Sequence, residues 1–218
     1  MSNAAESLLW LYRELARRGL NHGSSGNVSC RQGDALLITP TGATAESLRA
    51  EQMVAVPLAG PAAPGSAPSS EWPMHAAVYA ACPRAEWVVH CHADACTALA
   101  CLNEGLPVFH YAVVGFGGSA GVPCAPYATF GTPALAATVT QTIPGHTACL
   151  LANHGMICHG RDAEGALATA IRLETLARQY LLARSAGTPR LLSAEEVEQA
   201  RQRYRTYGRP TPPAEDPA

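Results

Sequence analysis

Val88-Val89-His90-Cys91-His92-Ala93-Asp94 is the stretch around which the other motifs of this sequence are arranged. The β-branched Val88 and Val89 predict a buried strand. Side chains alternate between the two faces of a strand, so His90 and His92 are expected to project together while Cys91 points the other way. Two imidazoles on one face form half of a tetrahedral zinc site, although an isolated His-X-His also occurs as two ordinary core or surface histidines.

Two residues elsewhere in the chain can complete such a site. His154 follows the apolar stretch 148–152 and precedes Gly155, at the end of a predicted strand, where loops often carry functional groups. Glu71 precedes a predicted helix and is either a metal ligand and general base or a first-turn carboxylate favoured by the helix dipole. His75 lies one helical turn after Glu71, which leaves a rival Glu-x-x-x-His metal pair open.

The composition limits the class of protein. The 218 residues are 48% hydrophobic and carry a net charge of −2, with Lys+Arg 15 against Asp+Glu 17, which gives no indication of a nucleic-acid or anionic-membrane partner. No apolar run approaches the ~18 residues of a membrane span, and no signal-peptide pattern is present. The eight cysteines form no C-x-x-C pair, so we expect reduced thiols in a cytoplasmic protein.

Predicted helices and strands alternate irregularly, which favours one α/β domain whose sheet need not be parallel. Helices are expected at 6–18, 44–51, 72–81, 97–102, 133–142, 163–184 and 195–204, and strands at 34–39, 53–58, 88–94, 107–114 and 148–152. The Pro- and Gly-rich segment 57–70 is interpreted as a surface loop leading into the site rather than a linker. We assign residues 1–208 to the domain and expect a disordered tail at 209–218.

Three donor-rich turns predict a phosphate site: Gly26-Asn27, Thr41-Gly42 and Ser69-Ser70. Each offers hydroxyl, amide or backbone N–H donors, and glycine lets the main chain approach a ligand closely. If they converge, they can hold a phosphate without a lysine, although each alone is also typical of an ordinary turn. The sequence has no GxxxxGK[ST] motif and no GxGxxG after a strand, so nucleotide binding of those types is excluded.

An ordered series of motifs runs over nearly the whole chain: Gly26–Ser29, Ile38–Gly42, Ser69–Trp72 with His75, Val88–His92, His110-Tyr111, Cys124–Thr132 and His154-Gly155. This series resembles the class II aldolase/adducin family, and within it the branch that cleaves L-fuculose 1-phosphate. The resemblance implies a single α/β domain with a largely antiparallel central sheet flanked by helices. It also implies a homotetramer of four-fold symmetry in which neighbouring subunits share active sites.

The resemblance further implies a role for individual residues. Zn²⁺ is bound by His90, His92 and His154, with Glu71 as fourth ligand and acid/base catalyst. The phosphate is held by Asn27, Thr41, Gly42, Ser69 and Ser70. The aldehyde receives a proton from Tyr111 of a neighbouring subunit and lies in a pocket shaped by Phe130, Tyr204 and Tyr207.

Three features depart from the family pattern and bear on the aldehyde preference. Asn153 stands where a second histidine is expected, and Tyr204 stands where a phenylalanine is expected. The glycine loop Gly115–Gly121 is one residue too long. Without the resemblance, the usual burial of tyrosine would make Tyr111 a buried aromatic residue on an apolar strand and not a proton donor.

The implied reaction is the reversible cleavage of a phosphorylated small sugar, a ketose 1-phosphate such as L-fuculose 1-phosphate, to dihydroxyacetone phosphate and a hydroxyaldehyde. Zinc acts as a Lewis acid, Glu71 moves the proton at the nucleophilic carbon, and Tyr111 donates to the other carbonyl oxygen. One alternative is a pentulose-phosphate 4-epimerase or a sugar-acid-phosphate decarboxylase on the same scaffold, and Glu71 argues against the epimerase, which carries aspartate there. The other is a non-enzymatic, adducin-like interaction domain, which would lose the histidine set.

Overall fold

One central sheet organises residues 2–206, the part of the chain that the computed structural model describes. Within that range seven strands pair in the order β3-β2-β1-β4-β7-β6-β5, and every neighbouring pair is antiparallel except β5 with β6. The sheet is therefore largely antiparallel, as predicted. The strands are β1 (Asn27–Gln32), β2 (Ala35–Ile38), β3 (Val54–Pro57), β4 (Trp87–Cys91), β5 (Cys124–Ala125), β6 (Ala148–Leu151) and β7 (Gly155–Gly160).

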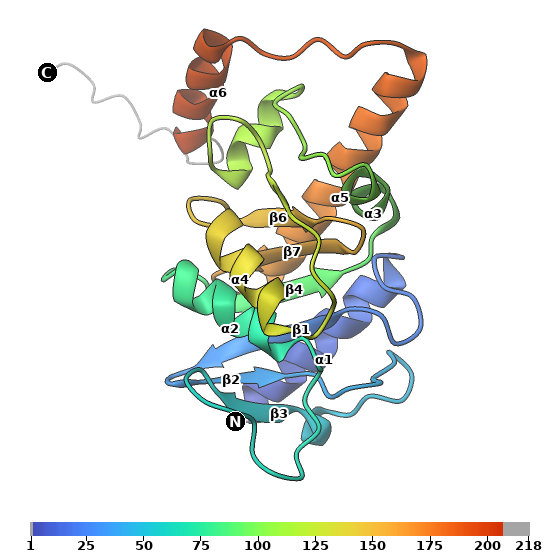
Figure 1. Ribbon diagram of the computed structural model, residues 1–218, viewed down its shortest axis with the longest axis vertical. Coiled ribbons are helices and arrows are strands. Elements are labelled where there is room, and N and C mark those ends of the chain that lie inside the picture. Colours follow the sequence, from blue (N-terminus) through green and yellow to red (C-terminus); the bar gives the residue numbers. More distant parts are fainter. Residues whose placement is uncertain (1, 207–218) are drawn as a thin grey trace, which may run out of the picture.

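Helices cover both faces of this sheet (Figure 1). One face carries α2 (Trp72–Ala81) and α4 (Pro133–Thr142), and the other carries α1 (Ser2–Arg17), α3 (Asp94–Cys101) and α5 (Ala163–Ala186). The remaining helical elements are α6 (Ala194–Thr206), which packs on the 3-10 helix η2 (Tyr111–Phe116), and the short 3-10 helix η1 (Ala50–Gln52). The described residues form a single α/β domain.

The alternation of β4 separates the two hydrophobic layers. Val89 and Cys91 are fully buried in the layer that contains α1, α3 and α5, whereas Val88 is buried in the layer under α2 and α4. His90 points to the same side as Val88, because residues two apart share a face. The strand therefore directs His90 toward the start of α2.

The structure corrects several expected elements. The predicted strand 107–114 is wrong: this segment is a loop that runs into η2. The backbone N–H of Phe109 bonds back to the Pro107 carbonyl at 2.8 Å, and His110 Nδ1 accepts from the Ala112 N–H at 3.2 Å. These local bonds replace a strand ladder. The predicted helix 44–51 is also wrong, because only Ala50–Gln52 is helical there.

Three of the observed strands, β1, β5 and β7, lacked a clear sequence signal. The strand β1 begins at Asn27, inside the predicted turn Gly26-Asn27. β7 follows β6 as a hairpin whose apolar residues, Met156 to Cys158, form too short a run to distinguish a strand from a helix. The strand expected over 88–94 ends at Cys91, so His92 lies one residue beyond it.

None of the described helices is long and apolar enough to cross a membrane. All eight cysteines are free thiols in the structure. The expected tail 209–218 and the candidate pocket residue Tyr207 lie outside the described residues.

Candidate active site

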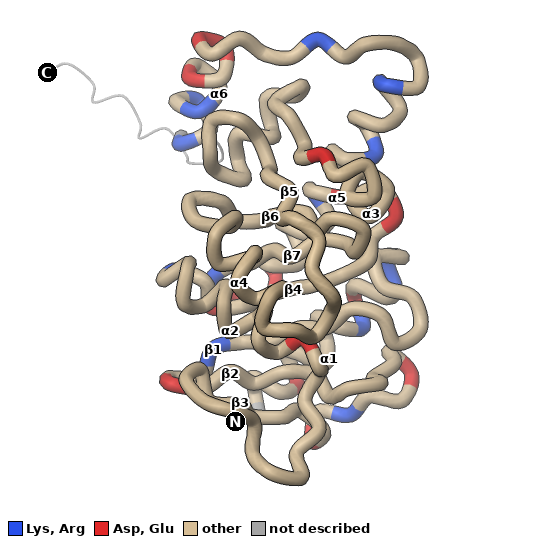
Figure 2. The backbone as a smooth tube through the Cα atoms, in the orientation of Figure 1, with Lys and Arg blue, Asp and Glu red and all other residues tan. Residues whose placement is uncertain are grey.

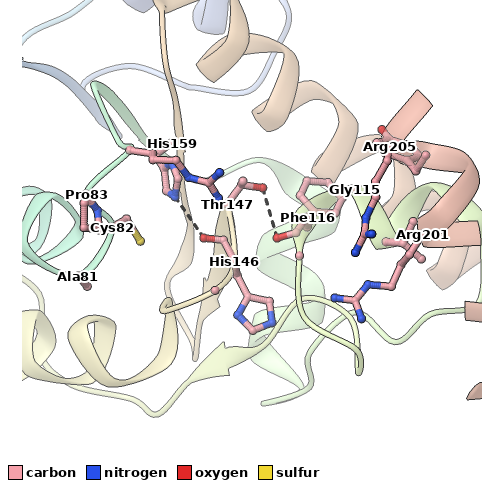
Figure 3. Close-up of a pocket in the computed structure, with 15 residues that line it drawn as sticks. Ala81, Cys82, Pro83, Gly115, Phe116, His146, Thr147, His159, Arg201 and Arg205 are labelled. Atoms are coloured by element: carbon pink, nitrogen blue, oxygen red, sulfur yellow. Dashed lines mark hydrogen bonds between the residues drawn. The ribbon is translucent and has the colours of Figure 1, made fainter. Parts of the chain in front are cut away.

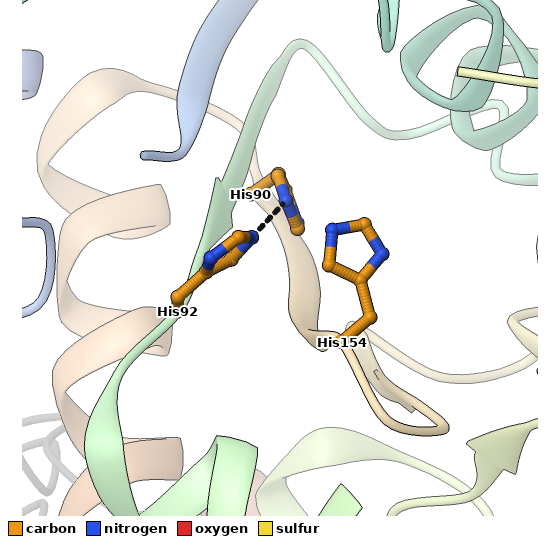
Figure 4. Close-up of side chains that lie close together, drawn as sticks. All are labelled: His90, His92 and His154. Carbon is orange, nitrogen blue, oxygen red and sulfur yellow. Dashed lines mark hydrogen bonds between the residues drawn. The ribbon is translucent and has the colours of Figure 1, made fainter. Parts of the chain in front are cut away.

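Three histidine side chains converge where β4 ends beside the turn between β6 and β7 (Figure 4). His90 lies on β4, His92 follows the end of that strand, and His154 lies in the turn between β6 and β7. Their ring centroids are 4.8–4.9 Å apart in all three pairs. The fold thus brings the distant His154 to the same-face pair that the sequence predicted.

Local backbone conformation aims these side chains. Asn153 adopts a left-handed conformation with φ 55° in the turn before His154, and asparagine tolerates this conformation better than most residues. Gly26, with φ 73°, passes beside β4 so closely that a Cβ there would lie 2.7 Å from the His90 carbonyl oxygen. Only glycine permits this approach, which brings the loop before β1 to the histidine cluster.

Distances between side-chain atoms show that the cluster fits a metal ion. His90 Nε2 lies 3.1 Å from His92 Nε2 and 3.2 Å from Glu71 Oε2. His154 Nε2 lies 3.3 Å from Glu71 Oε1. In a tetrahedral zinc site with ligand distances of about 2.0–2.1 Å, neighbouring ligand atoms are about 3.3–3.4 Å apart. The four side chains therefore have the spacing of one tetrahedral set.

The hydrogen bonds around the cluster leave two of its inward atoms, His90 Nε2 and Glu71 Oε1, available for a metal ion. His90 Nδ1 donates to the Met156 carbonyl at 2.9 Å, so the Nε2 lone pair faces the cluster. Glu71 is buried, and its Oε1 has no hydrogen-bond partner among the described residues. A buried carboxylate oxygen without a partner is costly, and a metal ion at this position would supply one.

The charge states also suit a divalent cation. Burial, and to a smaller extent the neighbouring His90, lower the pKa of His92 and of His154 to about 4. Burial raises the pKa of Glu71, but His90 and the hydrogen bond from Asn27 lower it by more, so the carboxylate stays ionised. At neutral pH His92 and His154 therefore offer neutral imidazoles and Glu71 offers one anion, the forms that bind Zn²⁺.

The predicted phosphate turns open into the same pocket. Its volume is about 380 Å³, within the usual range for small-molecule sites. Its walls include His92, His154 and Glu71 together with residues of the three turns: Asn27, Thr41, Gly42, Ser69 and Ser70. Metal-binding and phosphate-binding chemistry can therefore act on one small molecule.

A buried chain of hydrogen bonds leads from Glu71 into the core. Asn27 Nδ2 donates to Glu71 Oε2 at 2.9 Å, so Asn27 Oδ1 accepts from His75 Nε2 at 2.6 Å. His75 Nδ1 then accepts from the Ser29 hydroxyl at 2.7 Å, and Ser29 Oγ accepts from the Tyr79 hydroxyl at 2.8 Å. Because the carboxylate can only accept, every donor along the chain is determined.

The hydrogen-bond chain gives His75 a different role from that of a metal ligand paired with Glu71. Both of its ring nitrogens are engaged, by Asn27 and by Ser29, so it has no lone pair left for a metal. Burial, together with His90, lowers the pKa of His75 to about 3, so the ring is neutral. Ser29 and Tyr79 were not predicted from sequence as members of this hydrogen-bond chain. The signal was the spacing: Asn27 and Ser29 are two residues apart on one face of a strand, and His75 and Tyr79 are four residues apart on one face of a helix.

The aromatic candidates divide between two locations. Phe130 lines the histidine pocket together with Tyr127, which the sequence analysis missed, and both rings are mostly exposed. Tyr111 is 56% exposed at the start of η2 and does not line this pocket. Tyr204 lines a different cavity, and its hydroxyl accepts from Arg172 Nη1 at 2.7 Å. Within one chain, Tyr111 and Tyr204 are therefore separate from the histidine pocket.

Comparison with known proteins assigns the family. The family described as "Class II Aldolase and Adducin N-terminal domain" matches residues 6–181. The chain belongs to this family. Over 206 residues this class II aldolase is 41% identical to the 5-methylthioribulose-1-phosphate/5-deoxyribulose-1-phosphate aldolase of Rhodospirillum rubrum, with 93% of each chain covered. Over 196 residues it is 42% identical to the L-fuculose phosphate aldolase of Escherichia coli, with 89% of this chain and 91% of that one covered.

Structural comparison agrees with this assignment. A solved L-fuculose 1-phosphate aldolase superimposes with a TM-score of 0.88 and 31% identity, over 94% of this chain and 97% of the other. The predicted family, fold and enzyme class are confirmed, and the chain is a carbon–carbon lyase of the metal-dependent class II type. The relatives act on different ketose phosphates, as their names state, so the exact substrate is a separate question.

Proposed function

We propose that this class II aldolase uses zinc to cleave a ketose 1-phosphate, such as L-fuculose 1-phosphate, reversibly to dihydroxyacetone phosphate and a hydroxyaldehyde. One observation carries the proposal: a single pocket combines a tetrahedrally spaced histidine–carboxylate set with three turns rich in neutral donors. In addition, the 15 basic residues of the sequence are all arginine. The chain therefore has no lysine that could form a Schiff base with a ketone substrate.

His90, His92 and His154 would hold the zinc ion, with Glu71 as fourth ligand before substrate binds. The ion would act as a Lewis acid on the charge that develops beside the ketone carbonyl. The hydrogen bond from His90 Nδ1 to Met156 keeps that imidazole in the tautomer that binds metal. The nearly complete burial of His90 keeps water from competing for its nitrogen.

Glu71 is the proposed acid/base catalyst. In the direction of synthesis its carboxylate takes a proton from the carbon of dihydroxyacetone phosphate that becomes the nucleophile, and in cleavage it returns that proton. Its Oε1, which has no hydrogen-bond partner among residues 2–206, is the oxygen available for this transfer, while Asn27 holds Oε2 at 2.9 Å. The low pKa of Glu71 keeps the group in its basic form at neutral pH.

The phosphate group would lie against Thr41, Gly42, Ser69 and Ser70, whose hydroxyl and main-chain groups border the pocket. Asn27 can also contribute, because its amide nitrogen has a second hydrogen beyond the one donated to Glu71. Neutral donors suit a phosphate that binds close to a metal ion. They hold the phosphate in place without adding further positive charge beside that ion.

Tyr111 would act from a neighbouring subunit of a homotetramer by donating its hydroxyl proton to the aldehyde oxygen. Its exposure at the start of η2, outside its own histidine pocket, supports this arrangement. Phe130, with Tyr204 and Tyr207 from the neighbouring subunit, would surround the aldehyde. The apolar rings of Phe130 and Tyr127 favour an aldehyde with an apolar end, which also makes a 5-deoxyketose 1-phosphate a second candidate.

The test combines metal analysis with a coupled assay of dihydroxyacetone phosphate release. The zinc-loaded enzyme is assayed with L-fuculose 1-phosphate, 5-deoxyribulose 1-phosphate and a pentulose 5-phosphate control. We expect about one zinc per chain and release from one or both 1-phosphates. Epimerisation of the control without any cleavage would contradict the proposal, as would full activity after chelation with no zinc bound.

A further inference from the structure

A second cavity, of about 400 Å³, shares no lining residue with the histidine pocket. Its walls come from the segment after α2, from η2, from the turn before β6, from the far end of β7 and from α6 (Figure 3). His159 on its wall lies five residues after His154, mostly along β7, so at ~3.3 Å per residue these two residues are about 16 Å apart along the strand. The volume suits a small molecule.

The charged side chains that line this cavity are all basic. Arg84 follows α2, Arg201 and Arg205 belong to α6, and neither aspartate nor glutamate is among the residues that line it. Figure 3 shows Arg201 and Arg205 reaching from α6 toward His146. Figure 2 shows why α6 presents this charge, since its acidic positions lie at its start and its basic positions at its end.

Little in the described part of the chain neutralises these arginines. Among residues 2–206, Arg84 and Arg205 form no salt bridge, and Arg201 approaches the half-exposed Glu198 only to 3.9 Å. His159 is not a negative partner either: its Nε2 donates to the His146 carbonyl at 3.1 Å. Grouped guanidinium charges repel one another, so the arrangement favours an anion between them.

Arg172 adds positive charge behind the aromatic wall. Its Cζ lies 4.5 Å from the ring centroid of Phe116, and its Nη1 donates to the Tyr204 hydroxyl at 2.7 Å. Its buried Nε has no hydrogen-bond partner among the described residues. The cavity therefore joins an aromatic surface to a strongly positive one.

We propose that this cavity is a second anion site that binds a small phosphorylated molecule. Guanidinium N–H groups match phosphate oxygens in paired hydrogen bonds. A phosphate ester offers three free oxygens and up to two charges, so Arg84, Arg201 and Arg205 can all donate to it. A single carboxylate has only two oxygens and one charge. The ring of Phe116 can pack against the organic part of such a molecule.

The test is calorimetric titration of the zinc-loaded enzyme with inorganic phosphate. The double variant Arg84→Gln with Arg201→Gln removes charge from two walls of the cavity. The double variant Ser69→Ala with Ser70→Ala weakens the phosphate turns of the active site. The control is Arg161→Gln, an exposed arginine after β7 that forms no salt bridge among residues 2–206.

We expect two phosphates per chain in the wild type and in the control. The arginine variant should lose one of them, with affinity about 10-fold or more weaker, because bonds to charged groups are the strong ones. The serine variant should lose the other. An unchanged titration for the arginine variant would overturn the second site, and so would a change in oligomeric state by size exclusion in place of lost binding. If only the serine variant behaves like the wild type, the active-site phosphate assignment fails and the second site stands.

Discussion

Replacement of His75 tests whether the buried hydrogen-bond chain positions Glu71. In His75→Leu, Asn27 Oδ1 loses its 2.6 Å donor and the Ser29 hydroxyl loses its 2.7 Å acceptor. Ser29 keeps its bond to Tyr79, so Asn27 is the group left unpaired. An unpaired buried polar group costs about 1–3 kcal/mol, and a lost hydrogen bond costs about 0.5–1.5 kcal/mol. We therefore expect the free energy of unfolding to be about 2–4 kcal/mol lower in this variant than in the wild type.

The effect on catalysis follows from the Asn27 amide. Without His75 the amide can rotate, and Glu71 then loses its 2.9 Å bond to Asn27. A hydrogen bond to a charged group contributes about 1.5–3 kcal/mol, which corresponds to a kcat about 10- to 100-fold lower. His75→Gln, whose amide nitrogen can replace Nε2 as donor to Asn27, should recover much of this loss.

Tyr79→Phe is the matched control, because it shortens the same chain at its far end. It removes one bond to Ser29 and leaves His75, Asn27 and Glu71 connected, so we expect about 0.5–1.5 kcal/mol lower stability and wild-type kcat. The measurements are urea unfolding and the coupled cleavage assay with each variant fully loaded with zinc. Wild-type kcat in His75→Leu, or an equal loss of kcat in Tyr79→Phe, would refute a positioning role.

Four further predictions test the rest of the site. Glu71→Gln should retain fold and some zinc but lose about 10²–10⁴-fold in turnover, and near-normal turnover with zinc bound would remove Glu71 from catalysis. Mixing the inactive variants Tyr111→Phe and His92→Ala with subunit exchange should restore activity, whereas no recovery in mixed tetramers verified by mass would mean that sites are not shared. Zinc affinity, measured by chelator competition, should stay nearly constant from about pH 7 to about 5 and fall as the pH drops through about 4, because protonation of His92 and His154 removes their lone pairs; a flat profile through pH 4 would contradict their role as ligands. Gly26→Ala should unfold at lower urea and lose zinc, because the new Cβ would lie 2.3 Å from Asn21 Oδ1, and wild-type values for both would contradict the close packing.

The pH prediction follows from the direction of the pKa shifts. Both imidazoles have folded pKa values of about 4, below the ordinary value of 6.5, so between these values the unfolded chain binds more protons than the folded chain. The contribution of these two histidines to the stability of the metal-free protein is therefore complete above about pH 6.5 and is lost as the pH falls through about 4. Loss of bound zinc should follow in the same direction.

Sequence alone determined the features that depend on local periodicity. The apolar pattern and the proline at the first helical position gave Pro133–Thr142 its observed bounds, and strand alternation put His90 on the opposite side from Cys91. The order of motifs was enough to identify the family. These predictions succeeded because each depends on neighbours within a few residues.

Tertiary structure decided the features that depend on contacts between distant segments. Only the β6–β7 hairpin brings His154 to His90, and only the packing of α2 on β1 aligns His75 with Asn27. The segment 107–114 has a strand-like composition, yet its bonds close locally into η2 because no neighbouring strand pairs with it. The arginine cavity likewise combines segments from residue 81 to residue 205, and no sequence spacing predicts that such charges will meet.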